Sequence, residues 1–281
     1  MKKLITLLLT LTMLIAATCT AASADEPVKV YVTISNGSGE IVVAHESVEV
    51  TDVDEDGVIS ISDALSKAHG LFYPYGVDEG YGTFMSDYGL SLGKLWGEEN
   101  GGSYGYYVNN ASAWSLADPV QDGDSVYAFV YTDLTAWSDA YSWFEKDTVK
   151  AEAGEEISLT LKSAGFDADW NPVENAVEGA KIVVDGVDTG VVTDAEGKAV
   201  ITIAEAGKAI ISATSDTMTL VPPICVATVK AAAADEEVTE AAATLPNTGV
   251  ASTFAVVGLG LALTGAGVIL VSKTKKQEYS F

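Results

Sequence analysis

The C-terminus of the chain combines three segments that limit where the rest of it can fold. Leu245-Pro246-Asn247-Thr248-Gly249 comes first, a mostly apolar run from Ser252 to Ser272 follows, and Lys273-Thr274-Lys275-Lys276 closes the pattern. Pro246 fixes its own φ and favours an extended Leu245, so the pentapeptide can lie in a protease-like groove. The apolar run is long enough to cross a hydrocarbon core as a helix, and the lysines favour the cytoplasmic side. The folded part of the chain must therefore precede this pattern.

In this order and spacing the three segments resemble the LPxTG cell-wall sorting signal of Gram-positive surface proteins. The resemblance implies that sortase recognises Leu245, Pro246, Thr248 and Gly249 and transfers Thr248 to peptidoglycan. Residues 245–281 would then form a sorting signal whose transmembrane helix is present only before processing. An ordinary single-span tail anchor is the alternative, but it does not account for the pentapeptide.

The N-terminus has the pattern of a secretory signal peptide. Lys2-Lys3 form a positive n-region, Leu4 to Ala17 form an apolar h-region, and Ala22-Ser23-Ala24 is a cleavage motif. We expect residues 1–24 to be removed by cleavage between Ala24 and Asp25. A lipoprotein would use Cys19, but the residues before it make a poor lipobox, and a sorting signal would make the lipid redundant.

Residues 25–248, which remain after both cleavages, are strongly acidic. Of the 15 basic and 40 acidic residues in the chain, 10 and 39 lie in this range, giving a net charge of −29 with no arginine. Nucleic-acid binding is excluded because it needs a basic surface against phosphate, whereas divalent cations or cationic partners suit such a chain. Cys225 is the only cysteine left in the range, so no internal disulfide can form.

Residues 25–145 mix strand patterns with one helix pattern, which predicts an α+β domain. Apolar residues alternate from Val28 to Ile34, and the turn Asn36-Gly37-Ser38-Gly39 leads into a second strand. Helical spacing from Ile61 to Phe72, with Gly70 as the expected stop, predicts a helix. Further strands are expected from Tyr104 to Val108 and from Ser125 to Tyr131.

Three segments of this domain resemble the β-grasp C-terminal domain of transcobalamin and intrinsic factor. They are Leu95-Trp96-Gly97, Gly102 to Asn110 and Asp122 to Tyr131. The resemblance implies a β-grasp fold, with a core strand at Tyr106 to Asn109 and a turn before the last strand. Relatives that cap cobalamin do so beside an α-barrel domain, for which this chain has no counterpart, so corrinoid binding is not implied.

The twelve residues from Asp52 to Asp63 match the pattern of a calcium-binding loop. In that pattern carboxylates stand at positions 1, 3 and 5, glycine at 6, a carbonyl ligand at 7 and an acidic ligand at 12, while position 9 can hold a water. The matching residues are Asp52, Asp54, Asp56, Gly57, Val58, Ser60 and Asp63. Aspartate at position 12 resembles the dockerin loop, but dockerins carry two loops, so one calcium ion and no cohesin partner are implied. The alternative is an acidic turn in which Ser60 or Ser62 caps the helix.

Aromatic residues are abundant in the same domain and could bind a sugar or another flat ligand. The alternative is that most of them belong to the core, because alternate residues of each strand are buried. The candidate ligand contacts are Trp96, Tyr104, Tyr106 and Trp114.

Residues 146–231 show short alternating strands and frequent glycine turns, which predict an all-β sandwich. Gly179 to Gly186 and Thr193 to Val200 resemble Ig-like or prealbumin-like stalk modules of bacterial surface proteins. An isopeptide bond from Lys162 or Lys181 to an asparagine is not expected, because the family motif is missing. Residues 232–244 read as an Ala/Glu-rich linker.

No pattern in the chain indicates catalysis. His45 and His69 are the only histidines, and neither has a zinc-site or triad context. We therefore expect a secreted, wall-anchored binding or adhesion protein that is stabilised by calcium. Its expected partners are sortase, peptidoglycan and a surface ligand of unknown identity. Capture of a small ligand such as a corrinoid or glycan remains an alternative, and so does hydrolysis by a carboxylate pair, because carboxylates are abundant.

Overall fold

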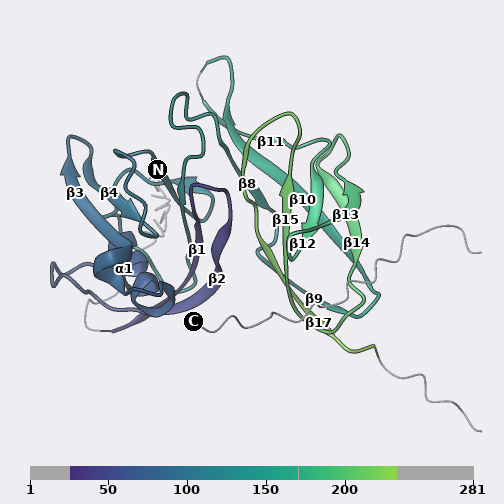
Figure 1. Cartoon of the computed structure of the whole chain (residues 1–281), viewed down its shortest axis with the longest axis horizontal. Coiled ribbons are helices and arrows are strands. Elements are labelled where there is room, and N and C mark those ends of the chain that lie inside the picture. Colours follow the sequence, from purple (N-terminus) through teal and green to yellow (C-terminus); the bar gives the residue numbers. More distant parts are fainter. Residues whose placement is uncertain (1–25, 170, 233–281) are drawn as a thin grey trace, which may run out of the picture.

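The computed structural model describes residues 26–169 and 171–232 (Figure 1). The cleavage site at Ala24 and Asp25, the sorting helix and the sortase contacts Leu245, Pro246, Thr248 and Gly249 lie outside the described residues. Within the described residues, no helix is long and apolar enough to cross a membrane.

The first module, residues 26–132, is built on a five-stranded mixed sheet. The strand order is β2-β1-β7-β5-β6, in which β1 runs antiparallel to β2 and parallel to β7. The turn between β1 and β2 forms because Asn36 Oδ1 accepts the N–H groups of Ser38 and Glu40. The strands are β1 (Val28–Ser35), β2 (Ile41–Val50), β5 (Tyr104–Val108), β6 (Ala111–Ser112) and β7 (Ser125–Val130).

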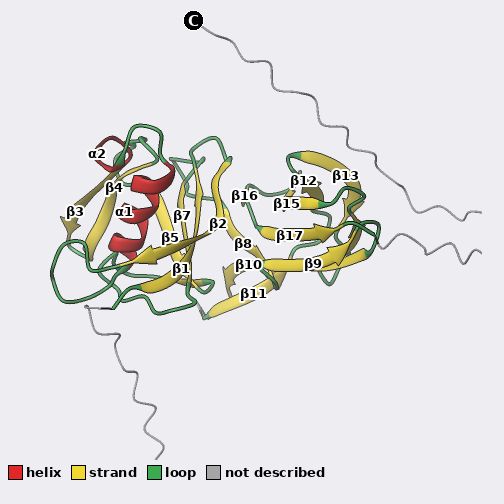
Figure 2. Ribbon diagram, turned by 90° about the horizontal axis from the view of Figure 1, so that it is seen from below, coloured by secondary structure: helices red, strands yellow, loops and turns green. Residues whose placement is uncertain are grey.

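One helix, α1 (Ile61–Phe72), covers a face of this sheet (Figure 2). Ile61, Leu65 and Ala68 are fully buried against the strands, as their spacing predicted. The helix continues two residues beyond Gly70, so the expected stop at that glycine is wrong. A short helix α2 (Val77–Gly80) and a two-stranded ribbon, β3 (Tyr81–Ser86) with β4 (Gly89–Leu95), follow.

The second module, residues 139–232, is a sandwich of two sheets. Strands β8, β10 and β14 lie in one sheet, and β12, β15 and β17 lie in the other, which is the division of strands in an immunoglobulin-like sandwich. Buried aliphatic side chains from both sheets form its core, so the expected all-β sandwich is confirmed. The strands are β8 (Ala140–Phe144), β9 (Thr148–Glu152), β10 (Glu156–Phe166), β11 (Pro172–Ala176), β12 (Lys181–Val184), β13 (Val187–Val192), β14 (Lys198–Thr202), β15 (Gly207–Thr214), β16 (Leu220–Val221) and β17 (Cys225–Lys230).

Strand β8 precedes the boundary expected between residues 145 and 146, yet it pairs with β10 and β16 of the sandwich. The segment before β8 is held by Asp139, whose carboxylate accepts hydrogen bonds from the Thr132 hydroxyl and N–H and from the Asp133 N–H. We therefore place the start of the second module at Asp139.

Aromatic side chains pack the two modules against each other. The Tyr141 ring of β8 stacks on the Tyr107 ring of β5, with centroids 3.6 Å apart and planes 5° apart. The Tyr127 hydroxyl donates to the Pro222 carbonyl, and Phe129 and Trp143 join the same buried cluster. Much of the aromatic content of the chain therefore forms an internal interface rather than a ligand platform.

Candidate functional site

The loop from Asp52 to Asp63 connects β2 to α1 and is shaped by its own carboxylates. Asp52 Oδ2 accepts the Gly57 N–H at 2.8 Å, and Asp56 Oδ1 accepts the Val58 N–H at 2.9 Å. Glu55 and Gly57 have φ values of 62° and 91°. A glycine at position 6 adopts such a backbone without strain, as the calcium-loop pattern requires.

Asp63 is the last residue of the loop pattern and lies in the first turn of α1. It is 2% exposed and forms a capping box with Ser60: its Oδ2 accepts the Ser60 N–H and hydroxyl at 2.8 and 2.7 Å. Its Oδ1 accepts the Val53 N–H at 2.9 Å. A carboxylate has about four acceptor positions, so these bonds leave one open, on Oδ1. Asp63 can therefore contact a cation through one oxygen while it continues to cap α1.

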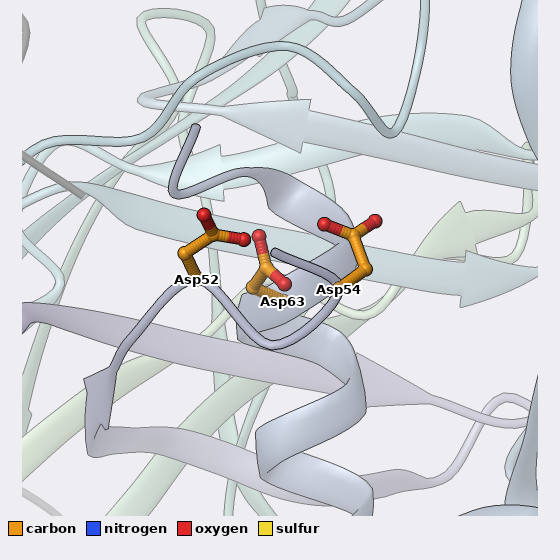
Figure 3. A group of neighbouring side chains, drawn as sticks. All are labelled: Asp52, Asp54 and Asp63. Carbon is orange, nitrogen blue, oxygen red and sulfur yellow. The ribbon is translucent and has the colours of Figure 1, made fainter. Parts of the chain in front are cut away.

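Three of the predicted ligands come together. Asp52, Asp54 and Asp63 each present an oxygen, and these oxygens lie within 4.8 Å of one another (Figure 3). The pKa of Asp54 is raised above its usual value, first by desolvation and then by the neighbouring Asp63 and Asp56 carboxylates. Like charges at this separation repel one another, and a divalent cation would relieve the repulsion.

The other predicted ligands are arranged differently. Asp56 is exposed and lies outside the group of three, with one oxygen held by the Val58 N–H. The Val58 side chain is 38% exposed. The Ser60 hydroxyl is engaged with Asp63, so it serves the helix cap that the alternative interpretation assigned to it. The cap and the carboxylate group thus coexist in one loop.

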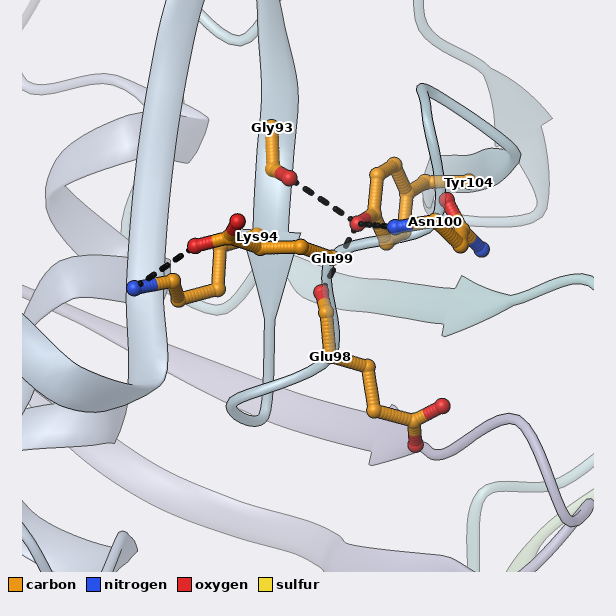
Figure 4. Close-up of polar contacts among 6 residues, drawn as sticks. All are labelled: Gly93, Lys94, Glu98, Glu99, Asn100 and Tyr104. Atoms are coloured by element: carbon orange, nitrogen blue, oxygen red, sulfur yellow. Dashed lines mark hydrogen bonds and ion pairs between the residues drawn. The ribbon is translucent and has the colours of Figure 1, made fainter.

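Of the four candidate aromatic contacts, three are half-buried. Trp96, Tyr104 and Tyr106 pack against the core of the first module. The Tyr104 hydroxyl lies 3.0 Å from the Gly93 carbonyl and 2.8 Å from the Glu98 carbonyl, and it accepts the Asn100 N–H at 3.2 Å (Figure 4). This hydroxyl therefore closes the loop between β4 and β5. Trp114, at 76% exposed, is available to a partner.

His69 has a structural role that its sequence context did not reveal. Its ring is completely buried, with Nδ1 2.7 Å from the Leu65 carbonyl and Nε2 accepting the Trp96 N–H at 3.1 Å. This arrangement requires the neutral ring with its hydrogen on Nδ1. Burial lowers its pKa to about 4.

The other candidates for chemistry are held in structural positions. The His45 ring stacks on Tyr31 at 4.6 Å, and burial lowers its pKa. Cys225 is buried in β17, and burial raises the pKa of its thiol to about 12, which suppresses the reactive thiolate.

An exposed apolar surface on the β3–β4 ribbon was missed in the sequence. Met85 and Tyr88 are 74% and 78% exposed, and Phe84 is 47% exposed. Trp114 precedes Ser115, whose hydroxyl accepts the Leu90 N–H at the outer edge of β4. We call Phe84, Met85, Tyr88 and Trp114 the tip surface. The signal in the sequence was the apolar Phe84-Met85 pair two residues before the turn at Asp87-Tyr88-Gly89, in a segment for which no element was predicted.

A separate groove of about 1070 Å³ runs between the two modules. Its walls are the β1–β2 turn, residues 37–41, and the segment from Ser212 to Leu220. Serine and threonine residues share this lining with apolar residues such as Ile41, Ile210 and Met218, and none of the four candidate aromatic residues contributes to it.

The sorting signal is also matched by a family model. A model described as the LPXTG cell wall anchor motif covers residues 237–278. This chain is anchored to the cell wall. The motif implies processing by sortase and covalent attachment to peptidoglycan, as in Gram-positive surface proteins.

Comparison with curated proteins finds no match. Among solved structures, the N-terminal four Ig domains of Dscam1 isoform 4.44 are similar at 10% identity and a TM-score of 0.21. The alignment covers 73% of this chain and 44% of that one, so this chain spans less than half of that protein's length. A score this low carries no argument about fold or binding.

Proposed function

We propose that the wall-anchored chain is a surface binding or adhesion protein whose first module carries the binding surface. The tip surface is the observation that supports this proposal. It consists of four large apolar side chains, on both faces of the β3–β4 ribbon and on the segment next to it, that are between 47% and 78% exposed. Exposed aromatic and methionine side chains are typical of protein interaction sites.

The position of the tip surface fits this role. The β3–β4 ribbon lies at one end of the long axis, and β17, after which the chain continues toward the anchor, lies at the other (Figures 1 and 2). The second module would therefore act as the stalk that holds the ribbon away from the wall.

We further infer that the first module is a β-grasp domain. The support is its strand order, with an antiparallel β1–β2 hairpin, a helix across the sheet, and a later strand, β7, inserted parallel to β1. A β-grasp module exposes loops and ribbons on a rigid sheet, and such segments commonly carry binding.

A single calcium ion is the cofactor we assign to the first module. The support is the convergence of Asp52, Asp54 and Asp63 and the positive φ of Gly57. Asp63 anchors the loop to α1, so a bound cation would tie the end of β2 to the start of the helix. Its role in the proposal is stabilisation rather than chemistry.

The proposal assigns no catalytic activity to the chain. A hydrolase would need a carboxylate pair free to act on a substrate, whereas Asp63 is buried and accepts three hydrogen bonds. We assign the carboxylate group to cation binding for this reason.

Beads coated with the processed chain, residues 25–248, test the proposal on layers of candidate host or bacterial cells. Coated beads should be retained, and the triple change Phe84→Ala, Tyr88→Ala and Trp114→Ala should reduce retention at least tenfold, because exposed aromatic anchors dominate interface energies. The matched control removes exposed valines from the stalk, Val192→Ala and Val200→Ala, and should leave retention unchanged.

The alternative of small-ligand capture gives a different result. A glycan array and an absorbance titration with a corrinoid would then show binding that survives the triple change and depends on groove residues such as Thr217. If such binding is found and coated beads are not retained, the function of the chain is capture of a small ligand and not adhesion.

A further inference from the structure

The two long edges of the β3–β4 ribbon differ in what covers them. On the β4 side, the Leu90 N–H donates to the Ser115 hydroxyl at 3.1 Å, and the Leu90 carbonyl accepts the Leu116 N–H at 2.8 Å. The Gly93 carbonyl accepts the Tyr104 hydroxyl at 3.0 Å. The outer edge of β4 is therefore closed by the rest of the module.

The outer edge of β3 is open. Leu90 directs its N–H and carbonyl away from β3, so its cross-strand partner Met85 directs its own groups away from β4. Thr83, two residues earlier, has the same orientation because the pattern alternates. Among the hydrogen bonds of residues 26–169 and 171–232, none from outside the ribbon reaches the backbone of Thr83 or Met85.

This edge has few of the features that normally protect an edge strand. Tyr81 to Ser86 contains no charged residue and no proline, and its one irregularity lies near the start, between Gly82 and Thr83. Phe84 and Met85 are exposed on its two faces. An open edge with apolar side chains is a template for a further strand.

The surroundings of this edge are acidic. Residues 26–132 contain seventeen acidic side chains and three lysines. Asp87 stands in the turn that ends β3. Lys94, the lysine of the ribbon, is paired with Glu99 at 3.0 Å. Charge complementarity therefore favours a cationic partner and disfavours a second copy of this module.

We propose that the open edge of β3 docks an extended polypeptide segment rich in lysine or arginine, which joins the ribbon as a third strand. This inference rests on the proposed binding function and names its partner class. Backbone hydrogen bonds to Thr83 and Met85 hold the segment, Phe84 and Met85 contact its apolar side chains, and the acidic surroundings attract its charges.

A labelled eight-residue peptide of alternating lysine and valine is the probe, and fluorescence anisotropy with the processed chain is the measurement. Saturable binding is expected at low ionic strength, with weakening as salt rises. The same peptide with glutamate in place of lysine should not bind. A version whose outward backbone N–H groups are methylated should bind at least tenfold more weakly, because it cannot pair with the edge.

Two variants of the chain locate the site. Met85→Pro removes the outward N–H and should weaken binding at least tenfold, and proline is tolerated at an edge whose N–H faces solvent. Met85→Arg keeps the N–H but repels the cationic probe, and it should also weaken binding at least tenfold. This variant locates the site if the proline variant does not fold. Val192→Ala, at an exposed valine of the stalk, is the control and should bind as the parent does.

Equal binding of the methylated and unmodified peptides would show attraction by charge alone and overturn the proposal. The proposal would also be overturned if the chain forms a dimer and Met85→Pro abolishes this dimer, because the edge would then bind a second copy. If the tip variants abolish bead retention while no peptide binds, the adhesion function stands and this inference fails.

Discussion

The contacts and burial of individual side chains were the hardest features of the structure to predict. Tyr104 and Trp96 were candidates for ligand contact because aromatic rings suit flat ligands, yet both pack inward. The Tyr104 hydroxyl joins carbonyls of Gly93 and Glu98, residues that precede it in the chain, and no spacing rule signals such a contact. The sequence context of His69 likewise gave it no role, and the hydrogen bond from the Trp96 N–H to its ring shows that role. Asp63 lies near Asp52 and Asp54, as the loop pattern suggested, because these residues are close in sequence; its role as a calcium ligand stays a prediction.

The neutral, buried His69 should make folding stability depend on pH. Its pKa is lowered to about 4 from 6.5, so between these values the unfolded chain binds a proton that the folded chain does not. Stability contributed by this group is present above pH 6.5 and is lost as pH falls toward 4, by about 3 kcal/mol in total. Urea unfolding in chelator at pH 7 and pH 4.5 should show a larger loss for the parent than for His69→Gln. Equal losses would contradict the assignment.

Two glycines of the first module should respond to alanine in opposite directions. A Cβ on Gly105 in β5 would lie 2.2 to 2.9 Å from the buried Phe129 ring, so Gly105→Ala should destabilise by about 1–3 kcal/mol. A Cβ on Gly70 in α1 meets nothing within 4 Å, so Gly70→Ala should stabilise by about 1 kcal/mol through helix propensity. Thermal unfolding of both variants measures this, and the same sign for both would be inconsistent with the packing.

At the level of elements, local sequence patterns predicted most of the structure. Alternation located β1 and β10, and helical spacing located α1. The β3–β4 ribbon was not predicted because β3 shows no apolar alternation and the alternation in β4 is short, with Leu90 and Leu92 followed by Gly93. Its strands exist because they pair with each other and because β4 is fixed by Ser115 and Leu116, which are about 25 residues away in sequence. Such long-range pairing leaves no signal within one strand.

Calcium should stabilise the loop between β2 and α1. At a concentration of about 100 times the dissociation constant, binding to the folded state adds about 2.7 kcal/mol, which raises Tm by roughly 5–10 °C in a domain of this size. Asp52→Asn together with Asp54→Asn should abolish the response in differential scanning calorimetry with and without chelator. Glu55→Gln, which removes a charge from the same loop outside the group of three, should keep it. If calcium does not change the Tm of the parent, the loop is an acidic turn and not a calcium site.

At the level of the whole molecule, composition and motifs predicted the anchoring but not the way the modules join. Strand β5 has aromatic residues on both faces and β7 has them on one, and the sequence does not reveal that the face with Tyr107, Tyr127 and Phe129 is covered by β8. Tyr107 and Tyr141 both fall within residues 25–145, the range expected for the first domain, yet they stack across the interface between the two modules. The modules therefore share a buried aromatic core and are not independent domains joined by a flexible linker.

A shared core should make the two modules unfold together. Calorimetry of the processed chain should show one transition, and Tyr141→Ala should cost about 3–5 kcal/mol or divide that transition in two, because it opens a cavity at the interface. Tyr75→Ala, at a tyrosine that is 75% exposed, should have little effect. Two transitions in the parent would mean that the interface is too weak to couple the modules.

Anchoring itself is tested by one change at the sorting motif. Thr248→Ala removes the residue whose carbonyl sortase would transfer to peptidoglycan, so the protein should move from the wall fraction to the membrane fraction. Asn247→Ala, at the variable position of the pentapeptide, is the control and should stay in the wall. Unchanged wall attachment of the Thr248 variant would refute the assigned cleavage site.

The parallel pairing of β9 with β17 has a mechanical consequence. A pull on the tip enters the sandwich from the β8 side, at the N-terminal end of β9, while the anchor pulls on the C-terminal end of β17. In parallel strands these two forces point in opposite directions along the strand axis, so they shear the ladder from Val226↔Thr148 to Lys230↔Glu152 rather than peel it open. Its hydrogen bonds then share the load and must break together. A bacterium held in flowing liquid by this protein would hang from that short ladder.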